Sequence, residues 1–482
     1  MMRGSLDQIA ASIEGAHVTR DAYFQGVSTD SRQLVPGSLF VALRGERFDA
    51  HDFLGQLVDK PLAAVVVETL PEHYPLPAIV VPDTLAALGR IGNFWRRRFA
   101  IPVIGVTGSN GKTTVKEMIA AILAAAFGAE ARLATQGNLN NEIGVPLTVT
   151  RLTDAHKAAV VELGMNHPGE IARLAAIAEP TVALVNNAQR EHQEFMHTVE
   201  AVARENGAVL QALAADGVAV FPGDDEYTAL WRELAGDRDV LTFGLSDECD
   251  VRAAYTPTEF GSELNVTSFP RRREPKLADA ATQANLGPRL RGGDVVEFTI
   301  KLNAAGVHNV RNALAATACA LAADIPVDAI VRGLEAFAPV SGRLQRKQAV
   351  SGATVIDDSY NANPDSVRAA IDVLAQYASP RILVLGDMGE VGTQGPEFHQ
   401  EIGAYAASRG IDTVLATGDL ARHLVGSGAQ HYEQFDELLA ALDQKLGSKS
   451  DATVLVKGSR FMKMERVVQH LIASTNTGKE AH

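Results

Sequence analysis

A polar, glycine-containing loop between an apolar run and a helical pattern is the part of this sequence best suited to chemistry. The apolar run Ile101–Val106 precedes it, and Val115–Phe127 follows with the pattern of a helix. Glycines let backbone N–H groups turn toward phosphate oxygens, the helix N-terminus adds positive charge, and a lysine here reaches the terminal phosphates. A glycine-rich turn with a surface lysine is the plainer alternative. The pattern predicts an ATP-binding loop of Thr107, Gly108, Ser109, Asn110, Gly111, Lys112, Thr113 and Thr114.

Two further side chains follow apolar strand-like runs in the same region. Glu162 ends the run that begins at Ala158, and His192 follows a run that ends at Val185. Because ligands bind at the carboxyl edge of an open α/β sheet, both residues are candidates for that edge. With the Thr113 hydroxyl they would form a Mg²⁺ site, although histidine is a less usual ligand for this ion than oxygen. Each residue taken alone is more simply a surface or structural polar group.

The elements that must position these residues fall into about three domains, since 482 residues exceed one core of ordinary size. Residues 1–100 contain the apolar runs Ser38–Leu43 and Ala63–Val67, which predict a small α/β domain that ends with a helix over Leu85–Phe99. Residues 101–339 alternate strands with Ala-rich helices, which predicts a mostly parallel sheet covered by helices. Residues 270–294 lack periodicity and are expected to form a mobile surface insertion. Its basic residues are expected to be solvated, and contact with substrate phosphates is the alternative.

The last segment, residues 340–482, alternates strands and helices again. Strands are expected at Thr354–Asp357, Ile382–Leu385, Thr413–Ala416 and Thr453–Val456, with helices after Pro364, after Pro396, over Phe435–Leu446 and after Arg460. The pattern is that of a dinucleotide-fold sheet. Gly386–Gly389 is an incomplete version of the glycine fingerprint, so no nicotinamide cofactor is expected.

Composition excludes several classes of protein. A net charge of −14 argues against a surface that neutralises nucleic acid or anionic lipid, so neither partner is expected. Cys249 and Cys319 are the only cysteines and lie far apart, which indicates neither a disulfide framework nor a zinc site. The first fifteen residues lack a secretory signal, and no apolar run is long enough for a membrane span. We expect a cytoplasmic protein.

Three longer stretches resemble the Mur ligase family, and the similarity extends over nearly the whole chain. They are Thr135–Pro146, Val161–Asn166 and, most distinctively, Asp357–Pro364 with the text Asp-Asp-Ser-Tyr-Asn-Ala-Asn-Pro. Within the family they are most similar to the branch that adds D-alanyl-D-alanine to UDP-N-acetylmuramoyl-tripeptide. The resemblance implies three α/β domains: residues 1–100 for the uridine nucleotide, 101–339 for ATP, and 340–482 as a dinucleotide-fold-like ligase domain.

The resemblance also implies roles for single residues. ATP would be held across the second and third domains by Asn309, Asn312, Arg343 and Asp358. The substrates would be bound by Ser28, Asp30, Ser31, Arg32, Asn138, Asn140, Asn361, Lys457, Ser459 and Arg460. From the residues alone, without the family resemblance, Ser28–Arg32 is interpreted as an ordinary turn. Lys457–Arg460 is then interpreted as a positively charged turn between a strand and a helix.

The sequence departs from the family at one position. Many Mur ligases carry a lysine that is carbamylated and helps to bind a second Mg²⁺, and Asn206 stands in its place here. Asparagine cannot be carbamylated. The segment Gln189–Phe195 around His192 also follows the family's histidine segment only in part.

The expected reaction is the joining of a carboxylate to an amine through an acyl phosphate, with ADP and phosphate as products, catalysed by Lys112, Glu162 and His192. ATP and Mg²⁺ are the expected cofactors, and the C-terminal domain is expected to close on the central one in a monomer. Alternatives within the fold are a sister ligase that adds a single amino acid and a folylpolyglutamate synthetase. A regulatory ATP-binding module that makes no bond is an alternative of another class.

Overall fold

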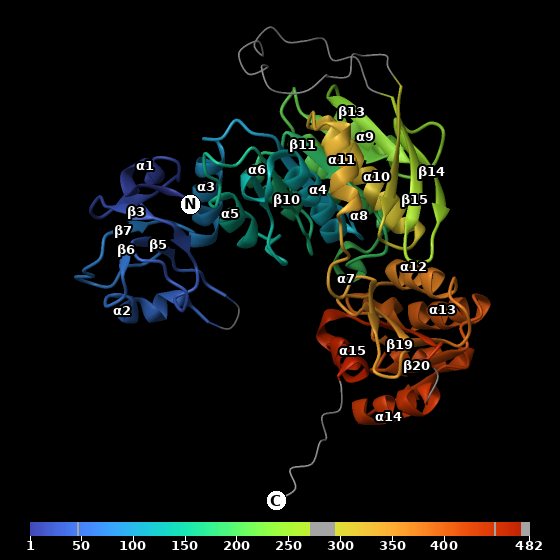
Figure 1. Ribbon diagram of the computed structural model, residues 1–482. Helices are drawn as coiled ribbons and strands as arrows, with labels where there is room; N and C mark the ends of the chain where they lie inside the picture. Colours follow the sequence, from blue (N-terminus) through green and yellow to red (C-terminus); the bar gives the residue numbers. More distant parts are fainter. Residues whose placement is uncertain (46–47, 270–294, 448–449, 474–482) are drawn as a thin grey trace, which may run out of the picture.

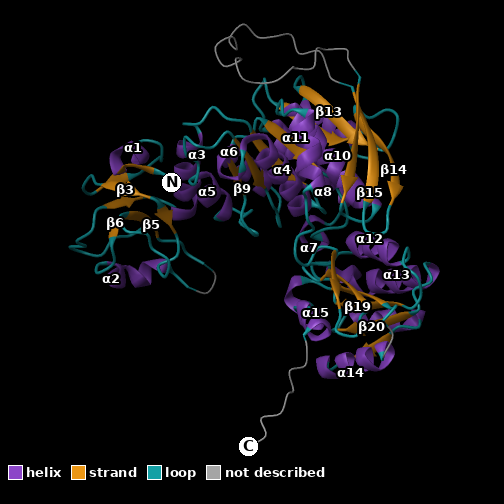
Figure 2. Ribbon diagram, viewed as in Figure 1, coloured by secondary structure: helices purple, strands orange, loops and turns teal. Residues whose placement is uncertain are grey.

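The computed structural model describes residues 1–45, 48–269, 295–447 and 450–473. The expected insertion at 270–294 therefore lies outside the described residues. Three parallel-rich sheets, each with its own helices, follow one another along the chain (Figures 1 and 2). The N-terminal and C-terminal sheets lie on different sides of the central one. Among the described residues, no helix has the length and apolar character that crossing a bilayer requires.

The N-terminal unit is a five-stranded sheet with a two-stranded ribbon. The sheet order is β2 (His17–Val18), β7 (Ala78–Val80), β6 (Leu62–Val67), β5 (Ser38–Val41) and β4 (Val27–Ser28), with only β2–β7 antiparallel. The ribbon pairs β1 (Arg3–Ser5) with β3 (Tyr23–Gln25), and the helices are α1 (Leu6–Ala10) and α2 (Leu54–Leu57). The apolar runs predicted at Ser38–Leu43 and Ala63–Val67 thus become β5 and β6.

Helix α3 (Thr84–Arg96) connects this unit to the central one. It ends at Arg96 rather than at the expected Phe99, because the Arg96 guanidinium donates to the carbonyls of Phe99 and of Ala178 at the end of α6. Those bonds turn the chain out of the helix and toward the next strand. Asn93 also donates to α6 at the carbonyl of Ala176, so α3 packs firmly on the central unit.

The central unit is a nine-stranded sheet in the order β16-β15-β14-β13-β12-β11-β8-β10-β9. The parallel part comprises β9 (Arg132–Ala134), β10 (Ala158–Glu162), β8 (Val103–Thr107), β11 (Val182–Val185), β12 (Val218–Pro222), β13 (Asp239–Gly244) and β14 (Val251–Pro257). Strands β15 (Ser262–Ser268) and β16 (Val296–Leu302) extend it in antiparallel fashion. The mostly parallel sheet predicted from the sequence is thus confirmed.

Helices cover both faces of this sheet. One core contains side chains from α4 (Lys112–Phe127), α10 (Val307–Ala322) and α11 (Val327–Glu335). The other contains side chains from α5 (Gly144–Val149), α6 (Glu170–Ala178), α8 (Val199–Gln211) and α9 (Thr228–Ala235), and α7 (Gln193–Met196) contributes Met196. Neighbouring β8 residues Val103 and Ile104 enter opposite cores, as the alternation of side chains along a strand requires.

The C-terminal unit is a six-stranded sheet in the order β17 (Gln345–Gln348), β18 (Thr354–Asp358), β22 (Thr453–Lys457), β19 (Arg381–Gly386), β20 (Thr413–Thr417) and β21 (Gln430–Tyr432). Only β17–β18 is antiparallel. Helices α12 (Pro364–Leu374) and α13 (Gly395–Ser408) cover one face, and α14 (Phe435–Leu446) and α15 (Glu465–Ile472) cover the other. The helix expected after Arg460 begins only at Glu465, because a 3₁₀ turn, Arg460–Met462, comes first.

Candidate active site

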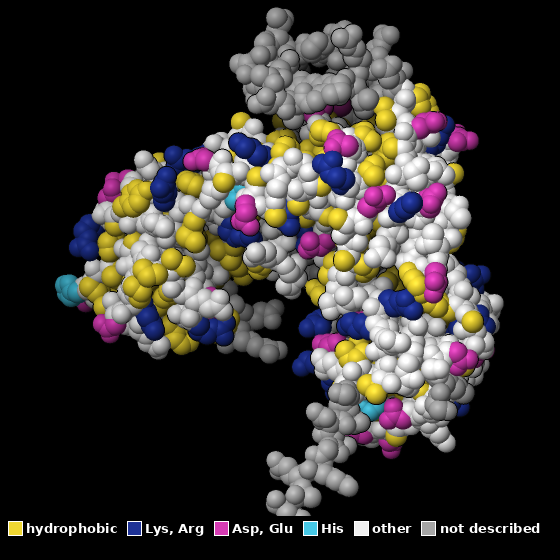
Figure 3. Space-filling view, viewed as in Figure 1, with side chains coloured by type: hydrophobic (Ala, Val, Ile, Leu, Met, Phe, Trp, Pro, Cys, Tyr) yellow, Lys and Arg dark blue, Asp and Glu magenta, His cyan; other side chains and the backbone are white. Residues whose placement is uncertain are grey.

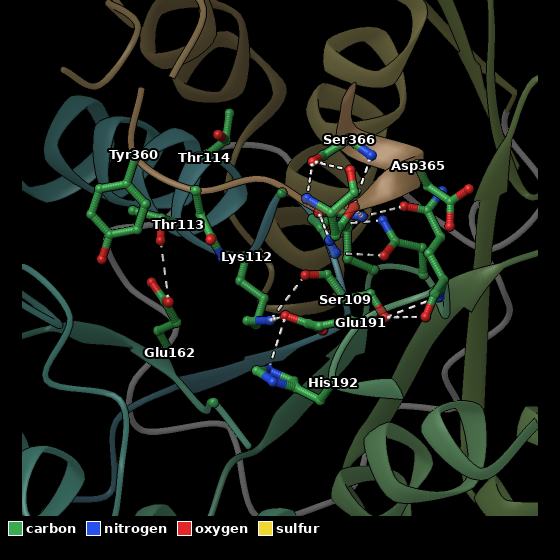
Figure 4. A pocket seen from close by; sticks show the side chains of 18 of the residues that line it. Ser109, Lys112, Thr113, Thr114, Glu162, Glu191, His192, Tyr360, Asp365 and Ser366 are labelled. Carbon is green, nitrogen blue, oxygen red and sulfur yellow. Dashed lines mark hydrogen bonds and ion pairs between the residues drawn. The ribbon is translucent and has the colours of Figure 1, made fainter. Parts of the chain in front are cut away.

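A cavity of about 890 Å³ lies where the central and C-terminal units meet. The loop between β8 and α4 and the segments after β10 and β11 line it from the central unit, and the segments after β18 and β22 line it from the C-terminal unit. All of these segments stand at the carboxyl ends of parallel strands. Figure 4 shows the phosphate-binding candidates converging in this space. The observed site is therefore the edge at which open α/β sheets bind ligands.

The loop between β8 and α4 turns on two glycines with positive φ. Gly108 has φ of 129° and Gly111 has φ of 81°, and α4 begins directly after Gly111. A Cβ on Gly111 would stand 2.5 Å from Asn312 Oδ1 in α10, so a side chain at this position has no room. Asn186, after β11, donates from Nδ2 to both Asn110 O and Asn312 Oδ1, at 2.8 and 3.0 Å. The loop is thereby held to α10.

Lys112 directs its ammonium back onto the loop. Its Nζ donates to the carbonyl oxygens of Gly108 and Ser109 and to Glu191 Oε1, the last at 3.0 Å. The three partners use all three donors of the ammonium. Lys112 is therefore positioned at the phosphate loop and is occupied by protein oxygens.

Glu162 and Thr113 meet at the end of β10. Thr113 Oγ1 donates to Glu162 Oε1 at 3.2 Å, and Asn140 Nδ2 donates to the same oxygen at 2.9 Å. Glu162 is only 2% exposed, and its second oxygen, Oε2, has no hydrogen-bond partner among the described residues. A buried carboxylate oxygen without a partner is costly unless a ligand completes it.

His192 lies with two carboxylates rather than with Thr113 and Glu162. Its Nε2 is 3.4 Å from Glu191 Oε1, and its Nδ1 is 2.6 Å from Glu390 Oε2 in the C-terminal unit. Burial opposes protonation, but the two carboxylates outweigh it and raise the pKa of His192 to about 9. Burial likewise opposes ionisation of Glu191, yet Lys112 and His192 hold its pKa below the usual value. The group therefore carries ionised carboxylates and a protonated ring at neutral pH.

The C-terminal side of the cavity contains a buried ion pair. Lys457 Nζ, on β22, lies 2.6 Å from Asp358 Oδ2, on β18, and also donates to Asn361 O. Burial raises the pKa of Asp358, and the charge of Lys457 opposes that shift. The guanidinium groups of Arg343 and Arg460 stand 4.3 and 5.8 Å from the Tyr360 ring centre. Two cations therefore flank one aromatic ring beside the cavity, an arrangement suited to anionic ligands.

The phosphate loop touches the C-terminal unit directly. Asn110 and Asn363 exchange side-chain hydrogen bonds, with Asn363 Nδ2 donating to Asn110 Oδ1 at 2.9 Å. Asn363 is also the N-cap of α12 and accepts from Ser366 N. Ordering of α12 and ordering of the loop are therefore linked through one side chain.

Most residues expected at the site line the cavity. From the central unit these are Ser109, Asn110, Gly111, Lys112, Thr113, Thr114, Asn138, Asn140, Glu162, His192, Asn309 and Asn312, and from the C-terminal unit Arg343, Asp358, Asn361, Lys457, Ser459 and Arg460. Thr107 is instead buried in β8, where its hydroxyl donates to Leu184 O. Gly108 shapes the loop through its backbone and does not line the cavity.

The expected substrate residues of the N-terminal unit lie at the end of β4 (Ser28) and in the turn that follows it (Asp30, Ser31 and Arg32), outside this cavity. Asp30 pairs with the Arg32 guanidinium at 2.8 Å, and hydrogen bonds from Arg32 lower the pKa of Asp30 to about 2. Ser28 Oγ accepts from Asp30 N at 3.2 Å. In the space-filling view, open space separates the N-terminal and C-terminal units (Figure 3). Any ligand that contacts both the turn and the cavity must span that space or draw the units together.

The donor set fits Mg²⁺ in part. Thr113 and Glu162 offer hard oxygen ligands, and Glu162 Oε2 lacks a partner, which suits an oxygen-seeking cation. The ring of His192 is paired with Glu191 and Glu390 instead of with Thr113 or Glu162. Among the described residues, no cluster of three or more histidine, cysteine or carboxylate side chains is arranged to hold a metal ion. A cation here would therefore rely on ligands from a bound substrate as well.

Sequence reasoning missed several residues of the segment after β11. Asn186, Asn187, Gln189, Arg190 and Glu191 all line the cavity. The available signal was a run of polar residues directly after an apolar strand, in the same sheet as the phosphate loop. That signal points to an edge of the sheet but does not tell which of the polar residues face the cavity.

Comparisons with known proteins agree with this arrangement. The family description "Mur ligase middle domain" matches residues 106–320, and "Mur ligase, glutamate ligase domain" matches residues 342–460. The chain is 37% identical over 467 residues to the UDP-N-acetylmuramoyl-tripeptide–D-alanyl-D-alanine ligase of Escherichia coli, covering 96% of each chain. A crystal structure of MurF from Acinetobacter baumannii superposes with a TM-score of 0.87 at 32% identity, covering 98% of this chain and 99% of that one. The structure of MurF from Thermotoga maritima in complex with ADP superposes with a TM-score of 0.79 at 25% identity. The match covers 93% of this chain and 97% of that one.

Proposed function

This chain belongs to the Mur ligase family, and from that premise we propose that it joins D-alanyl-D-alanine to UDP-N-acetylmuramoyl-tripeptide in peptidoglycan precursor synthesis. The observation that carries the proposal is the near full-length similarity to a ligase named for this reaction. A phosphate loop that faces Asp358, Lys457 and Arg460 across one cavity is the geometry such a ligase needs. The enzyme is an ATP-dependent ligase that forms an amide bond.

The proposed division of labour follows the three sheets. Residues 1–100 bind the uridine nucleotide, with Ser28, Asp30, Ser31 and Arg32 at the substrate. Residues 101–339 bind ATP, and residues 340–482 complete the ATP site and receive the dipeptide. Closure of the outer units around the cavity would bring the three substrates together across the open space seen in Figure 3.

In the proposed reaction, an oxygen of the tripeptide's terminal carboxylate attacks the γ-phosphorus of ATP, and the bond to the β-phosphate oxygen breaks to release ADP. The amine of D-alanyl-D-alanine then attacks the acyl carbon, phosphate leaves, and the nitrogen loses a proton. Lys112 and the loop N–H groups stabilise negative charge on the transferring phosphoryl group. Thr113 and Glu162 would hold Mg²⁺, which would neutralise phosphate charge; a role for His192 in metal binding would require its ring to leave Glu191 and Glu390.

The two arginines beside Tyr360, on the C-terminal side of the cavity, support a role for that side in anion binding. Arg343 and Arg460 flank Tyr360; the charge of Arg343 also acts on the buried Asp358 carboxylate, and Arg460 pairs with Glu465. We assign Arg343 with Asp358, Asn309 and Asn312 to ATP. Asn138, Asn140, Asn361, Lys457, Ser459 and Arg460 are assigned to the peptide substrates. The soluble substrates and the composition favour a cytoplasmic monomer.

A lysine substitution tests the function. Lys112→Ala is expected to abolish phosphate release from ATP in the presence of UDP-N-acetylmuramoyl-tripeptide and D-alanyl-D-alanine, while binding of the uridine nucleotide persists. Lys60→Ala, in the N-terminal unit and far along the chain from the loop, is the control. Undiminished turnover in Lys112→Ala would reject the assigned site.

The choice of acceptor separates the alternatives. Phosphate release with D-alanyl-D-alanine but not with single amino acids supports the proposal, whereas the reverse indicates a sister ligase. Activity with folate polyglutamates indicates a folylpolyglutamate synthetase, whose fold is shared. ATP binding without any substrate-dependent phosphate release indicates a regulatory module.

A further inference from the structure

Glu191 is a buried carboxylate at the phosphate loop with an incomplete set of partners. Its Oε1 is shared by Lys112 Nζ at 3.0 Å and His192 Nε2 at 3.4 Å. Its Oε2 is buried and has no hydrogen-bond partner among the described residues. The side chain is 12% exposed and lines the cavity. Glu191 therefore combines a side chain that lines the cavity with a buried acceptor oxygen that has no partner in the described structure.

Lys112 cannot keep its present contacts when ATP binds. Its three donors go to Gly108, Ser109 and Glu191, and a lysine at this position of a phosphate loop donates to the terminal phosphates instead. Once the ammonium turns to phosphate, Glu191 loses its nearest cation. A buried carboxylate beside polyphosphate then requires another positive charge.

His192 does not supply that charge alone. Its ring stands between Glu191 and Glu390, and the shorter contact, 2.6 Å, is to Glu390. One cationic ring therefore faces two carboxylates. A net negative charge remains at Glu191 after Lys112 leaves.

Glu162, which lines the same cavity, has a second buried carboxylate oxygen without a partner among the described residues. It is 2% exposed, and Thr113 donates to its other oxygen. In Figure 4 the Lys112 side chain extends between Glu162 on one side and Glu191 with His192 on the other. Two carboxylates and a hydroxyl are hard oxygen ligands of the kind that Mg²⁺ prefers.

Asn206 provides no such ligand. It is 1% exposed in α8, and its Oδ1 already accepts from Gly108 N at 3.1 Å. Its remaining polar side-chain atom is the Nδ2 donor, which has no partner among the described residues and cannot bind a cation. Any carboxylate beyond Glu162 must therefore come from another element.

We propose that Glu191 is a carboxylate ligand of magnesium in the ATP complex, and that the ammonium of Lys112 occupies its place when nucleotide is absent. This proposal rests on the proposed function, because it assumes an ATP–Mg²⁺ complex at the loop. When magnesium takes the place of the Lys112 ammonium at Glu191, the lysine is free to bind phosphate. The Glu191 carboxylate then remains paired with a positive charge. Glu191 and Glu162 then hold cation charge from two sides of the loop.

Metal binding measured directly tests the proposal. Free Mn²⁺, followed by its electron paramagnetic resonance signal, is titrated with the full chain in the presence of ADP. Glu191→Gln is expected to raise the dissociation constant for Mn²⁺ by about tenfold or more. Glu194→Gln, which changes an exposed carboxylate three residues further on in α7, is expected to behave as wild type.

A purely charge-neutralising role for Glu191 predicts a different result for Glu191→Gln. If Glu191 only neutralises Lys112, Glu191→Gln will free the lysine and tighten binding of ADP without metal, and Mn²⁺ affinity will stay unchanged. That result would overturn the proposal. Failure of the wild-type chain to bind ADP with Mn²⁺ would instead reject the proposed function, so the two failures are distinguishable.

A second variant reports ligation itself. Glu191→Cys replaces a hard oxygen with a soft thiolate, which prefers Cd²⁺ to Mg²⁺. The ratio of Cd²⁺ to Mg²⁺ affinity, measured with ADP present, is expected to rise by about tenfold over wild type. An unchanged ratio in a variant that retains the wild-type melting temperature contradicts direct ligation.

Discussion

The main-chain N–H and the guanidinium of Arg190 all donate to the carboxylate of Asp365, with contacts of 2.9, 3.1 and 2.6 Å. Arg190 follows β11 of the central sheet, and Asp365 lies in the first turn of α12 in the C-terminal unit. Arg190 also binds Glu401 at 2.7 Å and stacks on Phe398. One arginine therefore joins the two units that enclose the cavity.

Arg190→Ala is expected to weaken this docking, because it leaves two carboxylates without their shared cation. The loss should be on the order of 1–3 kcal/mol, since the pairs are about three-quarters buried. The KM for ATP should rise, and small-angle scattering should report a larger radius of gyration. The KM and radius of Arg190→Lys should fall between those of wild type and Arg190→Ala, because lysine keeps the positive charge but lacks the planar guanidinium that binds two carboxylates.

Arg204→Ala is the matched control for that experiment. Arg204 pairs with Glu200 within α8, and both side chains are more than half exposed. Such a pair contributes about 0–1 kcal/mol. Equal effects of the Arg190 and Arg204 substitutions on KM and radius would show that the ion pair does not secure the interface.

Gly111→Ala is expected to destroy ATP binding, whereas Gly128→Ala should not. Both glycines have positive φ, 81° and 93°, so both substitutions carry a backbone strain of about 1–3 kcal/mol. A Cβ added at Gly111 would collide with Asn312 and Asn186, whereas a Cβ added at Gly128 would have no atom within 4 Å beyond its chain neighbours. Isothermal titration with ATP distinguishes the two. Similar affinities for both variants would mean that the loop relaxes around the added methyl group.

Asn206→Ala is expected to loosen the phosphate loop, because Gly108 N would lose its only side-chain acceptor in a buried site. An unsatisfied buried donor costs about 1–3 kcal/mol. Asn206→Asp keeps an acceptor but adds charge near the phosphates, so it should retain stability better and bind ATP worse. Thermal unfolding and ATP titration check the two effects separately, with exposed Asn303→Ala as the control. If Asn206→Ala and Asn206→Asp rank in the same order for thermal stability and for ATP affinity, the assigned hydrogen bond is contradicted.

His308 should make the protein sensitive to acid. Burial, with a smaller effect from Lys457, lowers the pKa of His308 to about 4. The folded chain thus binds fewer protons here than the unfolded chain, so the stabilisation is complete above about pH 6.5 and is lost as pH falls toward 4. His308→Gln should remove that dependence, which at most amounts to about 1.4 kcal/mol per pH unit.

Chemical denaturation at pH 7, 6 and 5 measures this contribution. The free energy of unfolding of wild type should fall more steeply than that of His308→Gln. His17→Gln, at an exposed position on β2, should follow wild type. Parallel curves for wild type and His308→Gln would exclude the histidine as the source of the acid sensitivity.

Local patterns predicted much of the fold because they act over a few residues. The helix expected over Phe435–Leu446 is α14 with the same bounds, since leucines at helical spacing supply its buried face. The loop before α4 was found because glycine, lysine and threonine stand between a strand and a helix. The C-terminal end of α3 differs from the prediction, because hydrogen bonds from the Arg96 side chain to distant carbonyls set it. The helix predicted after Arg460 is α15, which a 3₁₀ turn precedes.

The identity of the phosphate loop, the alternation of strands and helices and the family resemblance are properties of the sequence by itself, because each rests on neighbouring residues. Only the tertiary structure decided that Arg190 binds Asp365, that Asn110 meets Asn363, and that Glu191 rather than Glu162 pairs with Lys112. Those partners lie tens to hundreds of positions apart. Sheet order and docking of the units bring them together, and neither leaves a local pattern in the chain.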